Sequence, residues 1–285
     1  MNRIGKVFGK LREKGEKALV GYITAGDPSI EKSFEIAKTL CTAGVDILEL
    51  GMPFSDPTAD GPVIQRASMR ALKAGMTLQK AFEFVKRLRK DNIETPVILF
   101  SYYNPLFRYG GDRFYKNALE SEVDGVLVVD LPPEESKEFT EKWNGWTPEL
   151  FSFIRLIAPT TTPERMGEIL KDSSGFVYLI SKTGVTGSEE ILPSSKGSNP
   201  RDNLDYNEIS RMVQLIKTMT TVPVCVGFGV STPAQAARIA QIADGVVIGS
   251  AFEKTIEEHQ DNIDLLRILD NMVMEFKKAM VQQKP

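Results

Sequence analysis

The sequence is poor in the residues that most metal sites and nucleophilic sites use. Among 285 residues there are two cysteines, Cys41 and Cys225, and a single histidine, His259. The cysteines lack CxxC spacing, and each lies in a segment patterned for burial, so we expect both to be packing residues. His259 lies in the polar stretch EEHQDN, which offers no Ser-His or Cys-His pair. We expect no metal site, so acid–base chemistry must rest on carboxylates or tyrosines.

Several classes of protein are disfavoured by what the chain lacks. No apolar run reaches the roughly 18 residues that span a bilayer, and the N-terminus MNRIGKVFGKLREKG has no apolar signal segment. A net charge of -3 gives no basic surface for nucleic acid. The nucleotide-binding fingerprint GxGxxG and the GKS or GKT P-loop are also absent. We therefore expect a cytoplasmic protein that contacts neither membrane nor nucleic acid.

Eight short runs rich in Val, Ile, Leu and Phe are strand candidates. They are residues 19–24, 46–51, 96–102, 125–130, 151–158, 176–182, 223–229 and 245–250. Helical patterns alternate with them. These lie near residues 30–43, 63–90, 111–121, 134–143, 163–171, 205–219, 232–241 and 261–280.

Strict strand–helix alternation predicts a parallel sheet. Eight units without a linker favour a closed (βα)8 TIM barrel, one α/β domain over residues 1–285, rather than an open doubly wound sheet. A further helix over residues 2–14 places Ile4, Phe8 and Leu11 at helical spacing. We expect this N-terminal helix to plug one end of the barrel.

The stretch ELGMPFSDPTADGP, residues 49–62, joins a strand to a turn rich in Gly and Pro. Strand alternation puts Glu49 on the face opposite Leu48 and Leu50. If those leucines pack against helices, Glu49 is buried and its pKa is raised. Asp60 follows on a loop, where we expect it to be better solvated. Such a pair divides acid and base roles, although a structural Glu49 and turn-capping aspartates are the alternative.

The ends of other strands carry polar and aromatic residues on the same side of a barrel, where active sites lie. Asp27 and Asp130 each precede a proline, and we expect them to cap helices. Tyr102 fits a core aromatic whose polar tip reaches the surface. Trp143 and Trp146 are interpreted as packing residues.

Glycines end the seventh and eighth strand candidates, in VGFGVS and VIGS. Gly227, Gly229 and Gly249 would let backbone N–H groups approach an anion, and Ser250 adds a hydroxyl. The pattern predicts a phosphate-ester substrate; the alternative is that the glycines only make room at crowded strand ends. The long segment at about residues 183–204, rich in Ser, Gly, Asn and Pro, is expected to be a mobile lid over this site.

In combination, ELGMPFSDPTADGPVIQRA, SYYNPLF, DLPPEES, GVTG, GFGVS and IGSA closely resemble the tryptophan synthase alpha subunit family over nearly the whole chain. The resemblance implies a lyase that cleaves indole-3-glycerol phosphate into indole and glyceraldehyde 3-phosphate by a retro-aldol step, in tryptophan biosynthesis. It implies that Glu49 is the general acid and base and that Asp60 stabilises positive charge on the indole nitrogen. The substrate-binding residues that we expect are Tyr22, Phe100, Tyr178, Thr186, Gly187, Gly227, Gly229, Gly249 and Ser250.

The same resemblance implies a partner. Indole would pass to a beta subunit that holds pyridoxal phosphate, in a heterotetramer of two alpha and two beta chains, while this chain needs no cofactor. The residues expected to face the partner are Pro53, Asp56, Tyr102, Asn104 and Phe107. Two departures stand out: the extra stretch SSKGSNPRDN near residues 194–203, and Tyr22 where the family often has Phe.

Three other hypotheses stay open on the sequence. The long lid would suit a stand-alone lyase that releases free indole. A catalytically silent barrel that only regulates a partner would have no physical reason to keep both carboxylates. Another phosphate-binding barrel, such as an isomerase, would leave the 49–62 stretch unexplained.

Overall fold

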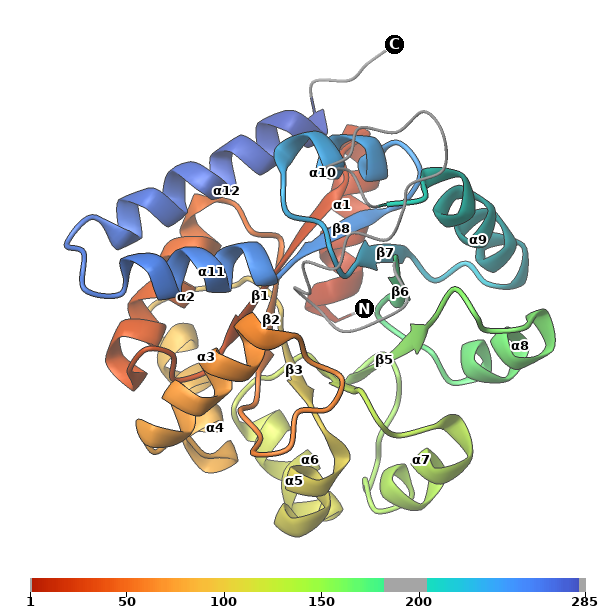
Figure 1. Cartoon of the computed structure of the whole chain (residues 1–285). Helices are drawn as coiled ribbons and strands as arrows, with labels where there is room; N and C mark the ends of the chain where they lie inside the picture. The colour runs from red at the N-terminus through yellow and green to blue at the C-terminus, as the bar shows by residue number, and fades with distance from the viewer. Residues whose placement is uncertain (1, 182–203, 282–285) are drawn as a thin grey trace.

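The computed structural model describes residues 2–181 and 204–281, and its eight strands form a closed parallel barrel in the order β1 to β8 (Figure 1). All eight predicted strands are confirmed, each within a few residues of its predicted ends. The strands are β1 Ala18–Thr24, β2 Ile47–Gly51, β3 Val97–Ser101, β4 Gly125–Val128, β5 Ser152–Ile157, β6 Val177–Ile180, β7 Val224–Gly227 and β8 Gly245–Ile248. The expected lid lies outside the described residues, apart from Leu204.

Helices surround the barrel and alternate with its strands. They are α1 Arg3–Lys14, α2 Ile30–Ala43, α3 Pro62–Lys73, α4 Leu78–Lys90, α5 Tyr103–Tyr109, α6 Gly111–Glu120, α7 Pro133–Thr140, α8 Pro163–Lys171, α9 Tyr206–Met219, α10 Pro233–Ala240, α11 Ser250–His259 and α12 Leu265–Val281. The single helix expected over 63–90 was wrong. Gly75 adopts a left-handed φ of 75° between α3 and α4, and Thr77 caps α4 by accepting a hydrogen bond from Lys80 N. Neither α5 nor α11 was predicted.

Side chains along each strand alternate between two apolar layers. In β2, Leu48 and Leu50 belong to the layer between barrel and helices, whereas Ile47 faces the barrel interior. The interior cluster also contains Ile4, Phe8 and Leu11 of α1, with the Phe8 ring 6.2 Å from that of Phe176. The N-terminal helix therefore closes one end of the barrel as predicted, which leaves the opposite end for the loops that carry the site.

Asp27 does not cap a helix, so that prediction was wrong, whereas Asp130 caps α5 rather than the helix that follows it. Ser29, two residues after Asp27, caps α2 by accepting a hydrogen bond from Lys32 N. Asp27 instead pairs with Arg70 at 2.6 Å. Asp130 accepts a hydrogen bond at 2.7 Å from the backbone N–H of Tyr103, in the first turn of α5. Both carboxylates thus join neighbouring units of the barrel.

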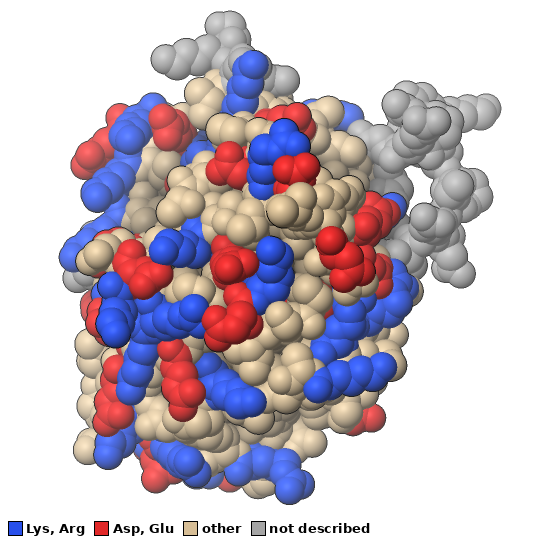
Figure 2. Space-filling model, turned by 90° about the vertical axis from the view of Figure 1, so that its left-hand side faces the viewer, with Lys and Arg blue, Asp and Glu red and all other residues tan. Residues whose placement is uncertain are grey.

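Three of the four predicted packing residues are buried, and Trp146 is partly buried. Cys41 and Cys225 are both buried and free, and Trp143 lies within a cluster of aromatic rings. Figure 2 shows Lys and Arg interspersed with Asp and Glu over the face that it presents. In the described ranges, no helix has both the length and the apolar character that crossing a bilayer requires.

Candidate active site

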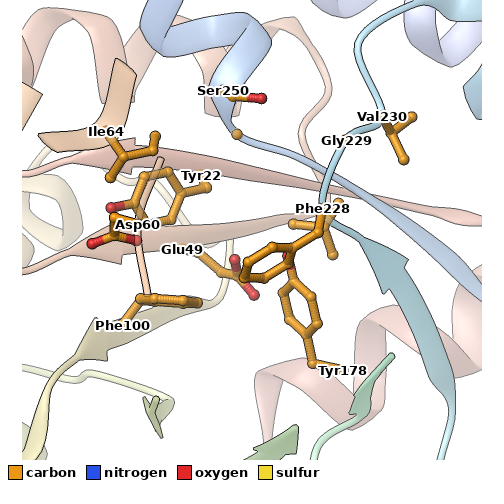
Figure 3. A pocket seen from close by; sticks show the side chains of 12 residues that line it. Tyr22, Glu49, Asp60, Ile64, Phe100, Tyr178, Phe228, Gly229, Val230 and Ser250 are labelled. Carbon is orange, nitrogen blue, oxygen red and sulfur yellow. The ribbon is translucent and has the colours of Figure 1, made fainter. Parts of the chain in front are cut away.

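Glu49 projects from the middle of β2 into the barrel, and Figure 3 shows its carboxyl group pointing to the centre of a pocket. Its side chain is fully buried, and neither oxygen has a hydrogen-bond partner among the described residues. Burial penalises the charged form and raises the pKa of Glu49 to about 8. The carboxyl group is therefore protonated at neutral pH and free to act on a ligand, as its position in the strand predicts.

Asp60, on the loop between β2 and α3, lines the same pocket as Glu49 (Figure 3). It is 8% exposed against 0% for Glu49, so it is the better solvated of the two, as predicted, but it is still buried. Burial raises its pKa to about 6, while a hydrogen bond from the Tyr102 hydroxyl to Oδ2, 3.1 Å long, acts in the opposite direction. At pH 7 Asp60 is thus mostly ionised beside a protonated Glu49.

Tyr102 fixes the loop that carries Asp60. Its hydroxyl accepts a hydrogen bond of 2.9 Å from Ala59 N while it donates to Asp60. Tyr102 was predicted to face a partner. It is 4% exposed, so its side chain offers a partner little surface. It is better described as the residue that positions Asp60.

Two tyrosines and a phenylalanine form the walls around Glu49. The Tyr22 ring meets Phe100 edge-on, with centroids 5.3 Å apart, and Tyr178 lies across the pocket (Figure 3). Gly51 leaves room for the Tyr22 hydroxyl, because a Cβ atom at residue 51 would lie 2.2 Å from that oxygen. Gly227 makes the same room for the Tyr178 hydroxyl, so these two glycines shape the pocket walls.

The remaining side of the pocket is formed by the ends of β7 and β8. Gly229 and Gly249 line it together with Ser250, the first residue of α11. Gly229 has a left-handed φ of 88°, and the first turn of α11 leaves backbone N–H groups without helical partners. These groups and the helix dipole favour an anion at this end. Thr186 and Gly187, predicted to complete this site, lie outside the described residues.

Some lining residues were missed from the sequence. They are Ile64, Phe228, Val230 and Val247. Phe228 was identifiable, because it stands between two glycines in VGFGVS and adopts a left-handed φ of 70° that is unusual for a bulky residue. Its ring meets that of Tyr178 edge-on at 5.7 Å. The other three are ordinary apolar residues with no local signal.

The residues predicted to face a partner lie on the loop after β2 and on α5, whose N-cap is Tyr102. Asp56, Asn104 and Phe107 are exposed, with Phe107 at 57%, and Pro53 is partly exposed. Within residues 2–181 and 204–281, no three His, Cys, Asp or Glu side chains are grouped to hold a metal ion.

Comparison with known proteins decides the family. Residues 8–281 match the family described as tryptophan synthase alpha chain. The chain belongs to the tryptophan synthase alpha chain family. It is 53% identical over 279 residues to the alpha chain of Desulfosudis oleivorans, covering 98% of this chain and 99% of that protein. The alpha chain of Desulfatibacillum aliphaticivorans is 51% identical over 280 residues, covering 98% of each.

Solved structures agree with this family. The alpha subunit from Legionella pneumophila strain Paris superposes with a TM-score of 0.85 at 37% identity and 98% coverage of both chains. A chain of Mycobacterium tuberculosis tryptophan synthase gives a TM-score of 0.83 at 32% identity and 99% coverage of both. As a tryptophan synthase alpha chain, this protein is a lyase that cleaves indole-3-glycerol phosphate to indole and glyceraldehyde 3-phosphate in tryptophan biosynthesis.

Gly51→Ala tests how this alpha chain shapes its pocket. The new methyl group would clash with the Tyr22 ring, which Phe100 holds, so we expect a loss of about 1–3 kcal/mol in stability and a raised KM. Gly167→Ala in α8 is the control, because nothing lies within 4 Å and helical Gly→Ala stabilises by about 0.5–1 kcal/mol. Thermal melts and KM measurements check both; an unchanged KM in Gly51→Ala would contradict the described fit.

A second cluster of carboxylates joins β1, α3 and α11 outside the pocket lining. Glu253 on α11 is fully buried and accepts a hydrogen bond from Thr24 N, and both burial and the charge of Asp27 raise its pKa well above the usual range. Arg70 of α3 pairs with Asp27 and with Glu257, each at 2.6–2.7 Å. The positive charge of Arg70 therefore offsets the negative charges of Asp27 and Glu257, and the two ion pairs link α3 to the end of β1 and to α11.

Arg70→Met should leave Asp27 buried and unpaired, since the Asp27 side chain is fully buried. We expect a loss of about 3–5 kcal/mol in the free energy of unfolding, as for other broken buried pairs. Lys38→Met, which removes an exposed pair with Asp91, should leave the unfolding midpoint nearly unchanged. Urea denaturation compares the two variants, and equal midpoints would show that the Asp27 pair is not a structural link.

Proposed function

We propose that Glu49 carries the proton in the cleavage of indole-3-glycerol phosphate. The protonated carboxyl group gives its proton to indole C3, which makes that carbon the leaving group. The resulting carboxylate then takes the proton of the C3′ hydroxyl as the C3–C3′ bond breaks and the aldehyde of glyceraldehyde 3-phosphate forms. The observation that carries this proposal is a fully buried carboxyl group, protonated at neutral pH, with no protein partner in the pocket.

In this proposal Asp60 stabilises the positive charge that develops on the indole nitrogen when C3 is protonated. Its pKa of about 6 keeps it mostly ionised while Glu49 is protonated. The Tyr102 hydroxyl holds its carboxylate in place, so little reorganisation is needed when the charge appears. The two carboxyl groups thereby take different roles because their environments separate their pKa values.

The remaining pocket residues orient the substrate. The phosphate would bind at Gly229, Gly249 and Ser250, completed by Thr186 and Gly187, with the indole ring between Tyr22, Phe100 and Tyr178. The space that the centres of water molecules can occupy in the pocket is only about 40 Å³, enough for a few waters. In this proposal a side chain moves when the substrate enters. Phe228 is suited to this because it is only partly buried and sits on strained backbone between two glycines.

The partner that we propose is a tryptophan synthase beta subunit that holds pyridoxal phosphate and receives the indole, in a tetramer of two alpha and two beta chains. The exposed Asp56, Asn104 and Phe107, with Pro53, would form part of the contact beside the pocket mouth. Phe107 supports this assignment, because a large aromatic side chain that is 57% exposed is the type of residue that anchors interfaces. A cytoplasmic location stays a prediction of the sequence.

The direct test is indole release from indole-3-glycerol phosphate by the purified chain, with and without an added beta subunit. We expect slow release that rises strongly with the beta subunit. Fast release that the beta subunit does not change would favour a stand-alone lyase. No release under either condition would contradict the proposed chemistry.

A further inference from the structure

A second cavity opens where β4 and β5 separate. The two strands pair only over Gly125–Leu127 and Ser152–Ile154, after which the end of β4 pairs with β3 and the end of β5 with β6. The resulting β4–β5 cleft has a volume of about 270 Å³. It is lined by Val128, Val129, Asp130, Leu131, Pro132, Pro133, Ile154, Arg155, Leu156, Arg165 and Ile169, none of which lines the active-site pocket.

Arg155 is the unusual member of this lining. It is only 4% exposed, yet its Nε and Nη1 atoms have no hydrogen-bond partner among the described residues. A single hydrogen bond of 2.6 Å, from Nη2 to the Ser136 hydroxyl, uses one of its five N–H donors, and the guanidinium stacks 3.9 Å from the centre of the Phe153 ring. A buried charge without a partner is costly. Burial accordingly lowers the pKa of Arg155 to about 10, with Asp172 and Glu134 offsetting part of the effect.

The other charged groups of the cleft are already engaged. Arg165 of α8 makes a two-pronged ion pair with Glu134 of α7. Asp130 accepts the hydrogen bond from Tyr103 N. Arg155 therefore contributes one positive charge that nothing in direct contact balances. The remaining lining is entirely apolar, contributed by the end of β4, the loop before α7, β5 and α8.

We propose that the β4–β5 cleft is a binding site for a small carboxylate monoanion with an apolar body, held by Arg155. The carboxylate would accept charge-assisted hydrogen bonds from the open guanidinium donors, and the apolar part would replace water against the valine, leucine, isoleucine and proline side chains. One negative charge balances Arg155, while the Asp130 carboxylate is held by the Tyr103 N–H. A phosphate dianion would leave an excess charge beside Asp130, which disfavours it. The volume lies near the lower end for small-molecule pockets, about 300 Å³.

Benzoate is a suitable probe, with the neutral benzamide and inorganic phosphate as comparison ligands. Binding is measured by calorimetry while a non-cleavable analogue of indole-3-glycerol phosphate occupies the active site, so that the readout is independent of turnover. We expect benzoate to bind with one site per chain and to bind more tightly than benzamide or phosphate. Equal affinity for benzoate and benzamide would contradict a site built on charge.

Arg155→Met should weaken benzoate binding by about tenfold or more, the effect of losing a charge-assisted hydrogen bond. Arg165→Gln is the matched control, because Arg165 lines the same cleft but is already paired with Glu134. This variant should keep most of the affinity for benzoate. Basal indole release should be unchanged in Arg155→Met. If Arg155→Met fails to fold, the side-chain N–H resonance of Arg155 in the wild-type chain should still shift on adding benzoate. An unmoved resonance, or undiminished binding in a folded Arg155→Met, would overturn the proposal.

Discussion

Glu49→Gln should lower kcat for indole release by about 10²–10⁴, the usual contribution of a general acid and base. The amide keeps the shape of the side chain but cannot give a proton to indole C3 or take one from the C3′ hydroxyl. Because neither oxygen of Glu49 has a hydrogen-bond partner among the described residues, the substitution breaks no protein hydrogen bond. Substrate affinity, measured by calorimetry with the variant, should therefore stay close to that of the wild type.

The same substitution should stabilise the fold at neutral pH. The pKa of Glu49 is about 8 in the folded chain against 4.5 as its usual value, so its stability contribution is present below pH 4.5 and is lost as pH rises toward 8. Glu49→Gln removes this loss and should raise the free energy of unfolding at pH 7 by about 3 kcal/mol. A variant that is more stable and yet inactive cannot owe its inactivity to misfolding.

Glu253→Gln is the matched control for Glu49→Gln. Glu253 is equally buried and its pKa is also raised, but it lies outside the pocket lining. It should keep most of the wild-type turnover. Comparable residual turnover in the two variants would rule out Glu49 as the proton carrier.

Asp60→Asn should lower kcat/KM by about 10²–10³, the range found when a preorganised electrostatic group is removed. The neutral amide still fits beside Tyr102 but no longer stabilises positive charge on the indole nitrogen. Asp56→Asn on the same loop is the control, because Asp56 is exposed and does not line the pocket. In the absence of a beta subunit, we expect Asp56→Asn to behave as wild type. Near-normal activity of Asp60→Asn would refute the electrostatic role.

Much of the fold was predictable because its determinants are local and repeated. Eight apolar runs alternating with amphipathic helices specify the barrel, and the period of two along β2 places Glu49 inside once Leu48 and Leu50 face the helices. The break between α3 and α4 was missed because the helical pattern continues on both sides of Gly75. A single glycine does not show in the sequence that the backbone turns left-handed there. Helix α11 was missed because its first turn was interpreted only as part of the phosphate site.

The environment of Asp60 was not predictable, because it depends on contacts between distant segments. Tyr102 comes 42 residues after Asp60, and only the closed barrel brings its hydroxyl to the carboxylate. The same holds for Arg155, whose environment depends on Ser136, on Phe153 and on the separation of β4 from β5. Sequence patterns place a side chain on a face, but they do not tell whether its polar atoms find partners there.

The pH dependence of kcat/KM for indole release tests the central claim most directly. A protonated Glu49 with a pKa of about 8 and an ionised Asp60 with a pKa of about 6 predict an optimum between these values. The substrate phosphate also titrates near pH 6, so the alkaline limb is the decisive one. The account predicts that activity falls with unit slope above about pH 8 and that Asp60→Asn keeps this limb. Activity that stays level or rises through pH 9 would contradict a protonated Glu49 as the acid that cleaves the substrate.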